Sequence, residues 1–301
     1  MAKSPFFPGF EHNISEVNSI ELSVHTGGKG APLLLLHGYP ETSAAWCKVA
    51  PDLAKKFTCV IPDLRGYGLS SVPETDADHL AYSKREMAKD MIALMQSLGF
   101  EHFNVLGHDR GARVSYRMAL DHPGHIDRIG IIEVVPTGDM WAAFTAEMAL
   151  KAYHWTFLAQ SAPLPENMIS GDPISYLEST LKSWAKEGTL DCFDPIALES
   201  YRAQFKDPQH IHAMCEDYRA GAFIDRELDD LSRSQEHKIK APLFFAWADQ
   251  GFPAQTGNPL GLWEEWAENV SGQAIENCGH FAHEENPQAI LECFVPFFLA
   301  D

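Results

Sequence analysis

The chain has few cysteines, few cations relative to anions and no long apolar run, and each shortage excludes a class of protein. Its 301 residues include six cysteines, none in Cys-x-x-Cys spacing, which disfavours a zinc ribbon or a disulfide scaffold and predicts reduced thiols. Lysine and arginine number 23 against 42 aspartates and glutamates, a formal net charge of −19. Such an excess of acid disfavours binding to nucleic acid or to an anionic membrane.

Membrane spans and export signals are lacking as well. The longest apolar runs, such as residues 32–36, are far shorter than the roughly 20 residues that cross a bilayer. The N-terminal Met-Ala-Lys-Ser-Pro is not followed by the apolar segment of a secretory signal. We therefore expect a cytoplasmic protein, and because the sequence shows no cluster of metal ligands or phosphate cradle, we expect neither metal nor cofactor.

What the sequence does contain is an alternation of strands and helices. Apolar runs predict strands, and segments of helical periodicity or composition lie between or after them. This alternation predicts βαβ units and a mostly parallel sheet covered by helices. The predicted strands are 33–36, 59–62, 103–106, 129–135, 242–246 and 273–276, and the predicted helices are 43–55, 83–98, 112–121 and 287–299.

One long segment interrupts the alternation. Residues 137–225 are rich in aromatics and read as helices without a strand. We interpret this segment as a helical cap inserted between two parts of an α/β core, residues 1–136 and 226–301. Because ligands of open α/β sheets bind outside the carboxyl ends of the strands, a cap there would shield the site from water.

Residues 107–111, Gly-His-Asp-Arg-Gly, have the spacing of the nucleophile elbow Gly-x-Ser-x-Gly but lack its serine. A predicted strand precedes them and a predicted helix follows, which is the context that this motif of α/β-hydrolases requires. Asp109 is thus the predicted nucleophile. A carboxylate is a poor catalyst of acyl transfer, but with an sp3 carbon bearing a leaving group it forms a stable ester. The elbow therefore indicates a hydrolase of carbon–halogen bonds or epoxides.

An ester intermediate needs a base to activate water. His280 follows the last predicted strand, where α/β-hydrolases carry their catalytic histidine. An acid is expected to orient this ring. Glu133, at the end of the strand predicted for 129–135, is preferred, and Asp249, after a later strand, is the alternative.

Two further features surround the predicted nucleophile. Residues 37–40, His-Gly-Tyr-Pro, follow the first buried strand, so the backbone N–H groups of Tyr39 and Arg110 are expected to form an oxyanion hole. Arg110 and Arg113 are three residues apart at the start of a helix and share one face. Two cations beside a carboxylate are costly unless an anion binds, and an arginine pair suits a substrate carboxylate.

With these residues, the whole chain resembles the fluoroacetate dehalogenases, a group of α/β-hydrolases. The resemblance rests on the elbow 107–117, on Asp-Leu-Arg-Gly-Tyr-Gly at 63–68, and on two cap segments, 153–155 and 215–222. The cap segments are the specific part, since epoxide hydrolases and haloalkane dehalogenases share the elbow. Glu133 departs from the group, which usually has Asp at this point.

The resemblance implies a role for each residue. Asp109 would displace the halide, and His280 would activate water against the ester. Arg110 and Arg113 would hold the substrate carboxylate, and His154, Trp155 and Tyr218 would donate hydrogen bonds to the leaving halide. Trp184 would line the pocket. The substrate would be fluoroacetate or a related short 2-haloacid, no cofactor would be needed, and the protein would be a homodimer.

Three other functions compete with this one. An epoxide hydrolase would need two cap tyrosines, for which Tyr218 and Tyr153 are the candidates. A haloalkane dehalogenase typically has Trp directly after the nucleophile, where this chain has Arg110. Neither uses the arginine pair. A non-catalytic binder of small acids would use the pair but not His280.

Overall fold

Nine strands form a single sheet in the computed structural model of the chain, which describes residues 2–300, with the order β1-β2-β3-β5-β4-β6-β7-β8-β9. The first three strands pair antiparallel and the other six run parallel. The expected α/β class with a mostly parallel sheet is confirmed. The strands are β1 (Ala2–Lys3), β2 (Glu11–Val17), β3 (Ile20–Gly28), β4 (Ala31–Leu36), β5 (Phe57–Pro62), β6 (Phe103–His108), β7 (Ile126–Ile132), β8 (Leu243–Ala248) and β9 (Val270–Ile275).

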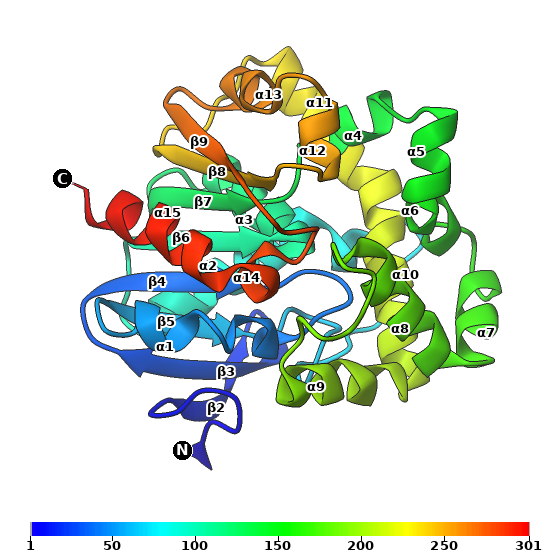
Figure 1. The fold of residues 1–301 in the computed structure, drawn as a ribbon, viewed down its shortest axis with the longest axis horizontal. Coiled ribbons are helices and arrows are strands. Elements are labelled where there is room, and N and C mark those ends of the chain that lie inside the picture. Colours follow the sequence, from blue (N-terminus) through cyan, green and yellow to red (C-terminus); the bar gives the residue numbers. More distant parts are fainter. Residues whose placement is uncertain (1, 301) are drawn as a thin grey trace.

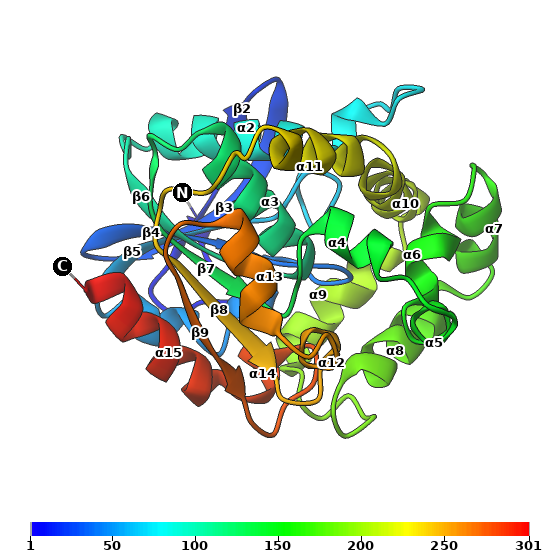
Figure 2. The same ribbon diagram turned by 90° about the horizontal axis from the view of Figure 1, so that it is seen from above.

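Helices cover both faces of the sheet. Figure 2 shows α2 (Lys84–Ser97) and α3 (Asp109–Asp121) on one face and α15 (Pro287–Leu299) on the other. The expected helix at 83–98 is confirmed because Ser83 caps it, accepting a hydrogen bond from Glu86 N at 3.2 Å. Four of its predicted apolar residues are fully buried: Met87, Met91, Leu94 and Met95. The core between α2, α3 and the sheet thus follows the sequence periodicity.

Three predicted boundaries were wrong. The helix expected at 43–55 is two short pieces, η1 (Ser43–Trp46) and α1 (Ala50–Leu53), with Pro51 in the first turn of the second. The strand expected at 129–135 ends at Ile132, because the backbone of Glu133 turns into the left-handed region with φ of 60°. The strand expected at 273–276 begins earlier, at Val270. Apolar periodicity misplaces the ends of helices and strands, because the local turns decide where an element stops.

The inserted helices lie together beyond one end of the sheet (Figure 1). The first of them begins at Thr137, after the short loop that follows β7. The helix after the last of them, α11 (Ile224–Ser234), leads back to β8. They are α4 (Thr137–Ala142), α5 (Ala146–Lys151), α6 (Tyr153–Leu158), α7 (Leu164–Ser170), α8 (Pro173–Trp184), α9 (Pro195–Phe205) and α10 (Pro208–Ala222). The domain limits 137 and 225 stay predictions.

Three insert helices start in the same way. Asp172, Asp194 and Asp207 precede the first prolines of α8, α9 and α10, and each carboxylate accepts a backbone N–H of the first turn. An aspartate cap followed by proline defines a helix start locally, without help from tertiary packing.

The remaining short helices complete the core. They are η2 (Leu80–Tyr82), α12 (Phe252–Gln255), α13 (Pro259–Trp266) and α14 (Ala282–Glu285). Among the described residues, no helix combines the length and the apolar character that crossing a membrane requires.

A buried cluster ties the two ends of the insert to α3. Asp229 of α11 accepts hydrogen bonds from Arg117 Nη2 at 2.7 Å, Tyr116 Oη at 2.9 Å and Gly138 N at 2.9 Å. The N–H of Thr137, the first residue of the insert, donates to Tyr116 Oη at 3.1 Å. We call Tyr116, Arg117, Thr137 and Asp229 the insert staple.

Asp229→Ala should lower the free energy of unfolding by about 3–5 kcal/mol, because it leaves the buried Arg117 cation without its carboxylate partner. Urea denaturation followed by circular dichroism measures this. The control is Glu147→Ala, which removes an exposed ion pair with Lys151 and should cost less than about 1 kcal/mol. Equal effects of the two changes would contradict the structural importance of the staple.

Candidate active site

The elbow places Asp109 at the junction of β6 and α3 with a left-handed backbone, φ 45°. Non-glycine residues avoid this region unless the surroundings impose it. Two glycines make the turn possible. A Cβ at Gly107 would lie 2.6 Å from Ala112 Cα, and one at Gly111 would lie 2.4 Å from the carbonyl oxygen of Leu36. The elbow spacing in the sequence therefore reflects close backbone packing.

The two oxygens of the Asp109 carboxylate have different surroundings. Oδ1 accepts a hydrogen bond from the backbone N–H of Tyr39 at 2.9 Å, whereas Oδ2 lies 3.7 Å from His280 Nε2. Burial raises the pKa of Asp109, but the nearby His280, His108, Arg110 and Arg113 together outweigh it and lower the pKa below its ordinary value. The carboxylate is thus ionised, and its Oδ1 contacts the N–H of Tyr39, one of the two expected oxyanion donors, while the oxyanion hole itself stays a prediction.

His280 lies on the loop between β9 and α14, where its backbone N–H donates to the carbonyl oxygen of Trp184 at 3.0 Å. Its ring contacts the Trp184 ring, with centroids 5.3 Å apart. Burial, assisted by repulsion from His108, lowers the pKa of His280 to about 3. The ring is therefore neutral at pH 7 and can accept a proton from water.

The two acids considered as partners of His280 are placed differently. Glu133 is buried at the end of β7, and its Oε2 accepts the N–H of Ala248 at 2.6 Å. Within residues 2–300 it makes no hydrogen bond to the His280 ring. Asp249 is exposed at the end of β8. The orienting role of Glu133 stays a prediction, and the exposed position of Asp249 is that of a solvated loop acid.

Arg110 is tied to an acid that the sequence analysis did not single out. Its Nε and Nη2 contact the carboxylate of Asp217 in α10, with Nη2 at 2.5 Å from Oδ1. Lys84 also pairs with this carboxylate, and the Tyr67 hydroxyl donates to it at 2.7 Å. Arg110 Nη1, which is buried, has no hydrogen-bond partner among the described residues. One N–H edge of Arg110 therefore stays available.

Arg113 is a buried cation without an acid partner in the described part of the chain. Its Nη1 donates only to neutral acceptors, the Val135 carbonyl at 2.9 Å and Thr137 Oγ1 at 3.0 Å, and its Nε has no partner there. Burial and the adjacent Arg110 lower the pKa of Arg113 from the ordinary 12.5. Because the ordinary pKa of arginine is so high, Arg113 remains a cation at neutral pH. A buried cation without an ion-pair partner of its own favours an anionic ligand.

The three residues expected to bind a halide come together from two cap helices. His154 and Trp155 of α6 pack against Tyr218 of α10, with ring centroids 5.6 and 6.1 Å from it. The Tyr218 hydroxyl and His154 Nδ1 are buried without a partner among the described residues. The Trp155 ring is held between Arg113, 4.6 Å away, and Arg110, 5.9 Å away. Burial lowers the pKa of His154 to about 3, so the ring is neutral.

Trp184 and Tyr39 close the same space. The Trp184 ring lies 4.4 Å from that of His154, and the Tyr39 ring lies 5.2 Å from that of Tyr218. The Tyr39 hydroxyl is engaged with Tyr176 at 3.3 Å. Contacts thus link these rings to Asp109 through the Tyr39 N–H, to His280 through Trp184 and to both arginines through Trp155, and the roles of the predicted site residues stay predictions.

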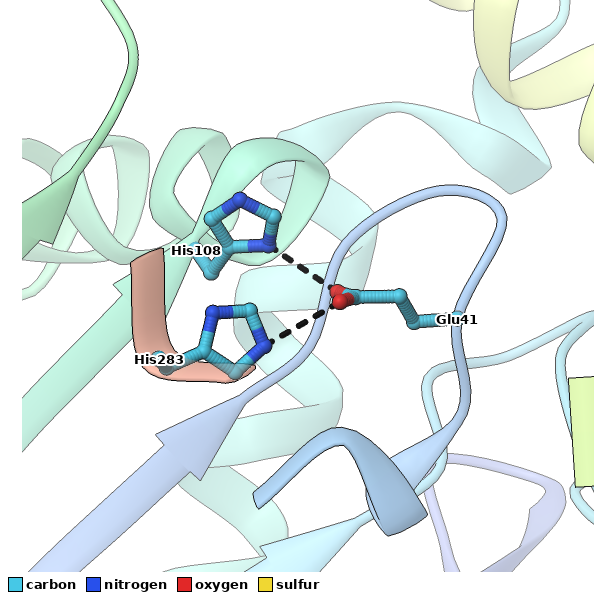
Figure 3. A group of neighbouring side chains, drawn as sticks. All are labelled: Glu41, His108 and His283. Atoms are coloured by element: carbon cyan, nitrogen blue, oxygen red, sulfur yellow. Dashed lines mark hydrogen bonds and ion pairs between the residues drawn. The ribbon is translucent and has the colours of Figure 1, made fainter. Parts of the chain in front are cut away.

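The sequence analysis missed four buried polar residues that support the site. Lys84 and Asp217 fix Arg110, and Glu41 and His283 form with His108 the one group in the described chain whose ligand atoms are spaced as a metal ion would need (Figure 3). Two signals could have pointed to them: His283 lies three residues after His280, and Asp217 lies beside Tyr218 in a cap segment already noted. Charged residues within apolar helices are rarely buried without a partner.

Glu133→Gln should become progressively more stable than the unchanged protein as pH rises from 5 to 8. Burial raises the pKa of Glu133 from 4.5 to about 8, so in this window the folded protein holds a proton that the unfolded chain has released. The contribution of this group to stability therefore falls as pH rises. The difference should reach a few kcal/mol in urea denaturation. Asp249→Asn is the control without such a trend, and a Glu133→Gln variant with no trend would show an ionised Glu133.

Comparisons with known proteins identify the family of the chain. The alpha/beta hydrolase fold family matches residues 31–287. A fluoroacetate dehalogenase from Burkholderia sp is 47% identical over 229 residues, 75% of each chain. A soluble epoxide hydrolase from Corynebacterium sp. (strain C12) is 33% identical over 291 residues, 95% of this chain and 96% of that protein. The crystal structure of a provisionally assigned alpha/beta hydrolase from Nostoc sp PCC 7120 has a TM-score of 0.93 at 43% identity, covering 97% of this chain and 99% of that one. The chain belongs to the α/β-hydrolase family, and it is a hydrolase of this fold.

Proposed function

We propose that this hydrolase is a dehalogenase that converts fluoroacetate, or a related short 2-haloacid, to the 2-hydroxy acid and halide. The observation that carries the proposal is the unpaired, buried Arg113 cation beside an ionised nucleophile. A neutral substrate leaves Arg113 with only the longer-range attraction of Asp109, whereas a substrate carboxylate pairs with it directly. The similarity to the Burkholderia fluoroacetate dehalogenase supports the same choice.

The charges near the site define how the substrate carboxylate binds. Asp217 already compensates one of the two cations that contact it, Arg110 and Lys84. Arg113 has no acid partner in the described residues and therefore supplies the main charge. Arg110 contributes its Nη1 N–H groups, which have no hydrogen-bond partner among the described residues. A carboxylate bridging these two guanidinium groups fixes C2 of a short acid in front of Asp109.

In the first step, Asp109 Oδ2 attacks C2 from the side opposite to the halogen. A C2–O bond forms as the C–halogen bond breaks, and the electron pair leaves with the halide. Fluoride is a basic, strongly solvated leaving group, so donors that converge on it lower the barrier. The free Tyr218 hydroxyl, with His154 and Trp155, supplies these donors. Backside attack inverts the configuration of a substituted C2.

In the second step, water hydrolyses the Asp109 ester. Neutral His280 takes a proton from the water as its oxygen attacks Cγ of Asp109, which suits the 3.7 Å gap between Nε2 and the carboxylate. The developing oxyanion is Oδ1, which already accepts the Tyr39 N–H at 2.9 Å. Collapse breaks the Cγ–Oδ2 bond, and the departing alkoxide takes the proton from His280 to leave as the hydroxy acid, which restores the neutral His280. The Asp109 carboxyl group then loses its remaining proton to solvent, which restores the carboxylate.

Epoxide hydrolysis is the second candidate, because the Corynebacterium relative is an epoxide hydrolase and Tyr218 offers a free buried hydroxyl. A second cap tyrosine is harder to find. Tyr153 is 44% exposed, and Tyr176 in α8 already accepts a hydrogen bond from the Tyr39 hydroxyl at 3.3 Å. An epoxide is neutral, so it also offers Arg113 no carboxylate to pair with.

Fluoride release from fluoroacetate should be measurable with an ion-selective electrode and should vanish in Asp109→Asn. His280→Asn should form the ester and then stall, so intact-protein mass spectrometry should show an added acetate unit on the protein. Chloroacetate and a simple epoxide are tested beside fluoroacetate. Opening of the epoxide with no halide from either acid would contradict the proposal, and binding of the acid without an adduct would indicate a non-catalytic binder.

Arg113→Met should lower kcat/KM for the haloacid by about 10²–10³, since a charge-assisted pair with the substrate is lost. Arg226→Met is the matched control, because Arg226 also lies over a tryptophan, 5.7 Å from the Trp141 ring, but is exposed. The control should leave kcat/KM within about twofold. An Arg113→Met enzyme with unchanged kcat/KM would show that the substrate is not held by this cation.

A further inference from the structure

A fully buried group of ionisable side chains lies directly behind the nucleophile. His108 precedes Asp109 in the elbow, Glu41 lies in the loop after β4, and His283 lies in α14. Figure 3 shows the carboxylate of Glu41 facing both histidine rings from one side, with one oxygen toward each ring. None of the three contacts the space in front of Asp109 Oδ2, so the chemistry described above does not use them.

Both ring nitrogens of His108 face acceptors that carry no proton. Nδ1 lies 2.9 Å from Glu41 Oε2, and Nε2 lies 2.8 Å from the backbone carbonyl oxygen of His280. A carboxylate and a carbonyl can only accept, so each ring nitrogen must donate. The ring with two N–H donors is the imidazolium cation. In agreement, burial lowers the pKa of His108 but the Glu41 charge and hydrogen bond outweigh it, and the pKa is raised above 6.5.

Glu41 extends the group to the oxyanion loop. Its Oε2 also accepts the backbone N–H of Gly38 at 3.1 Å, and its Oε1 lies 3.1 Å from His283 Nε2. The residue after Gly38 is Tyr39, whose N–H holds Asp109 Oδ1. One ion pair, Glu41–His108, thus joins the three backbone segments that carry the oxyanion donor, the nucleophile and the base.

We propose that His108 is a positioning residue that acts as a buried cation: paired with Glu41, it holds the His280 loop by its carbonyl and keeps Asp109 ionised and His280 unprotonated. This inference rests on the proposed function for its kinetic part only. His108 does not touch the substrate and acts through its two neighbours.

The distances make the electrostatic effect large. The His108 ring centroid lies 4.7 Å from that of His280, and Asp109 is the next residue. At such separations, a unit charge in a buried site shifts a neighbouring pKa by about one to two pH units. The cation opposes protonation of His280 and favours ionisation of Asp109, which are the states that the two chemical steps need.

Other charged or titratable groups act on the same two rings and must be considered in any pH experiment. Those that act on His108 or His280 are His37 and Glu41 from the β4 loop, Asp109 from α3, Glu133 from the end of β7, His154 from α6 and His283 from α14. His154 and His280 are neutral, and Glu41 and Asp109 are anions.

The same three side chains are spaced as metal ligands, but the hydrogen bonds favour protons. A ring nitrogen that ligates a metal must be unprotonated, whereas His108 Nδ1 donates to Glu41. Metal analysis of the purified protein therefore belongs to the test, and a stoichiometric transition metal that is lost in His283→Gln would overturn the assignment of His108 as a cation.

The kinetic test compares pH profiles of the unchanged enzyme and His108→Gln, using whichever substrate is turned over, since haloacid and epoxide routes both end in hydrolysis of the Asp109 ester. The unchanged enzyme should keep its kcat from pH 8 to about pH 5. In His108→Gln the acid limb should move upward by about one to two pH units. His283→Gln, which retains both His108 contacts, should move the limb less than His108→Gln does. A His108→Gln enzyme slowed equally at every pH would overturn the electrostatic role.

A second measurement requires neither a substrate nor a folded variant. Nitrogen NMR of the unchanged protein with ¹⁵N-labelled histidine should show one ring that carries protons on both nitrogens at pH 8 and is protected from exchange with solvent. If His108→Gln folds, that signal should be the one missing. Absence of a protected imidazolium would overturn the proposal even if fluoride release succeeds, and its presence would support it even if fluoride release fails.

Discussion

The left-handed turn at Asp109 is the constraint on which the rest of the site depends. It requires close packing of β6, α3 and the loop after β4, which Gly107 and Gly111 permit. That packing also brings the Tyr39 N–H to 2.9 Å from one carboxylate oxygen, while the other oxygen lies 3.7 Å from His280 Nε2. The turn therefore gives the two oxygens of one carboxylate different surroundings, and the proposed mechanism assigns the oxyanion to one of them and the attack to the other.

Burial of charge is the second organising theme. The site gathers several cations in an acidic protein, and each is compensated in a different way. Arg110 and Lys84 share Asp217, His108 has Glu41, and Arg113 has only neutral acceptors in the described chain. This unequal compensation distinguishes scaffold from binding site. Paired cations hold backbone segments and helices in place, while the unpaired one is the cation to which we assign the substrate anion.

Much of the fold was predictable because it follows from periodicity and from one rigid motif. The parallel strands, the helix at 84–97 and the elbow all have local signals. The antiparallel strands β2 and β3 were missed because both mix polar and apolar residues and lack a continuous apolar run. The candidate site residues could be predicted from the elbow motif and from the resemblance of the cap segments to a known family. Asp217, Glu41 and His283 were not singled out because pairing of buried charges depends on contacts between segments as far apart as 242 residues, such as Glu41 and His283, and no local pattern records such contacts.

The insert staple has a consequence for engineering. Its Thr137 both begins the insert and holds Arg113, through Oγ1 at 3.0 Å, while Asp229 returns the chain to the core. Since α8, α9 and α10 carry their own aspartate–proline starts, the body of the insert is a transferable module with locally specified parts. A chimaera that exchanges it for the insert of another α/β-hydrolase should place both junctions inside the staple, after residue 138 and before residue 229. The recipient then keeps its anion-binding arginine in register while the walls of its pocket are replaced.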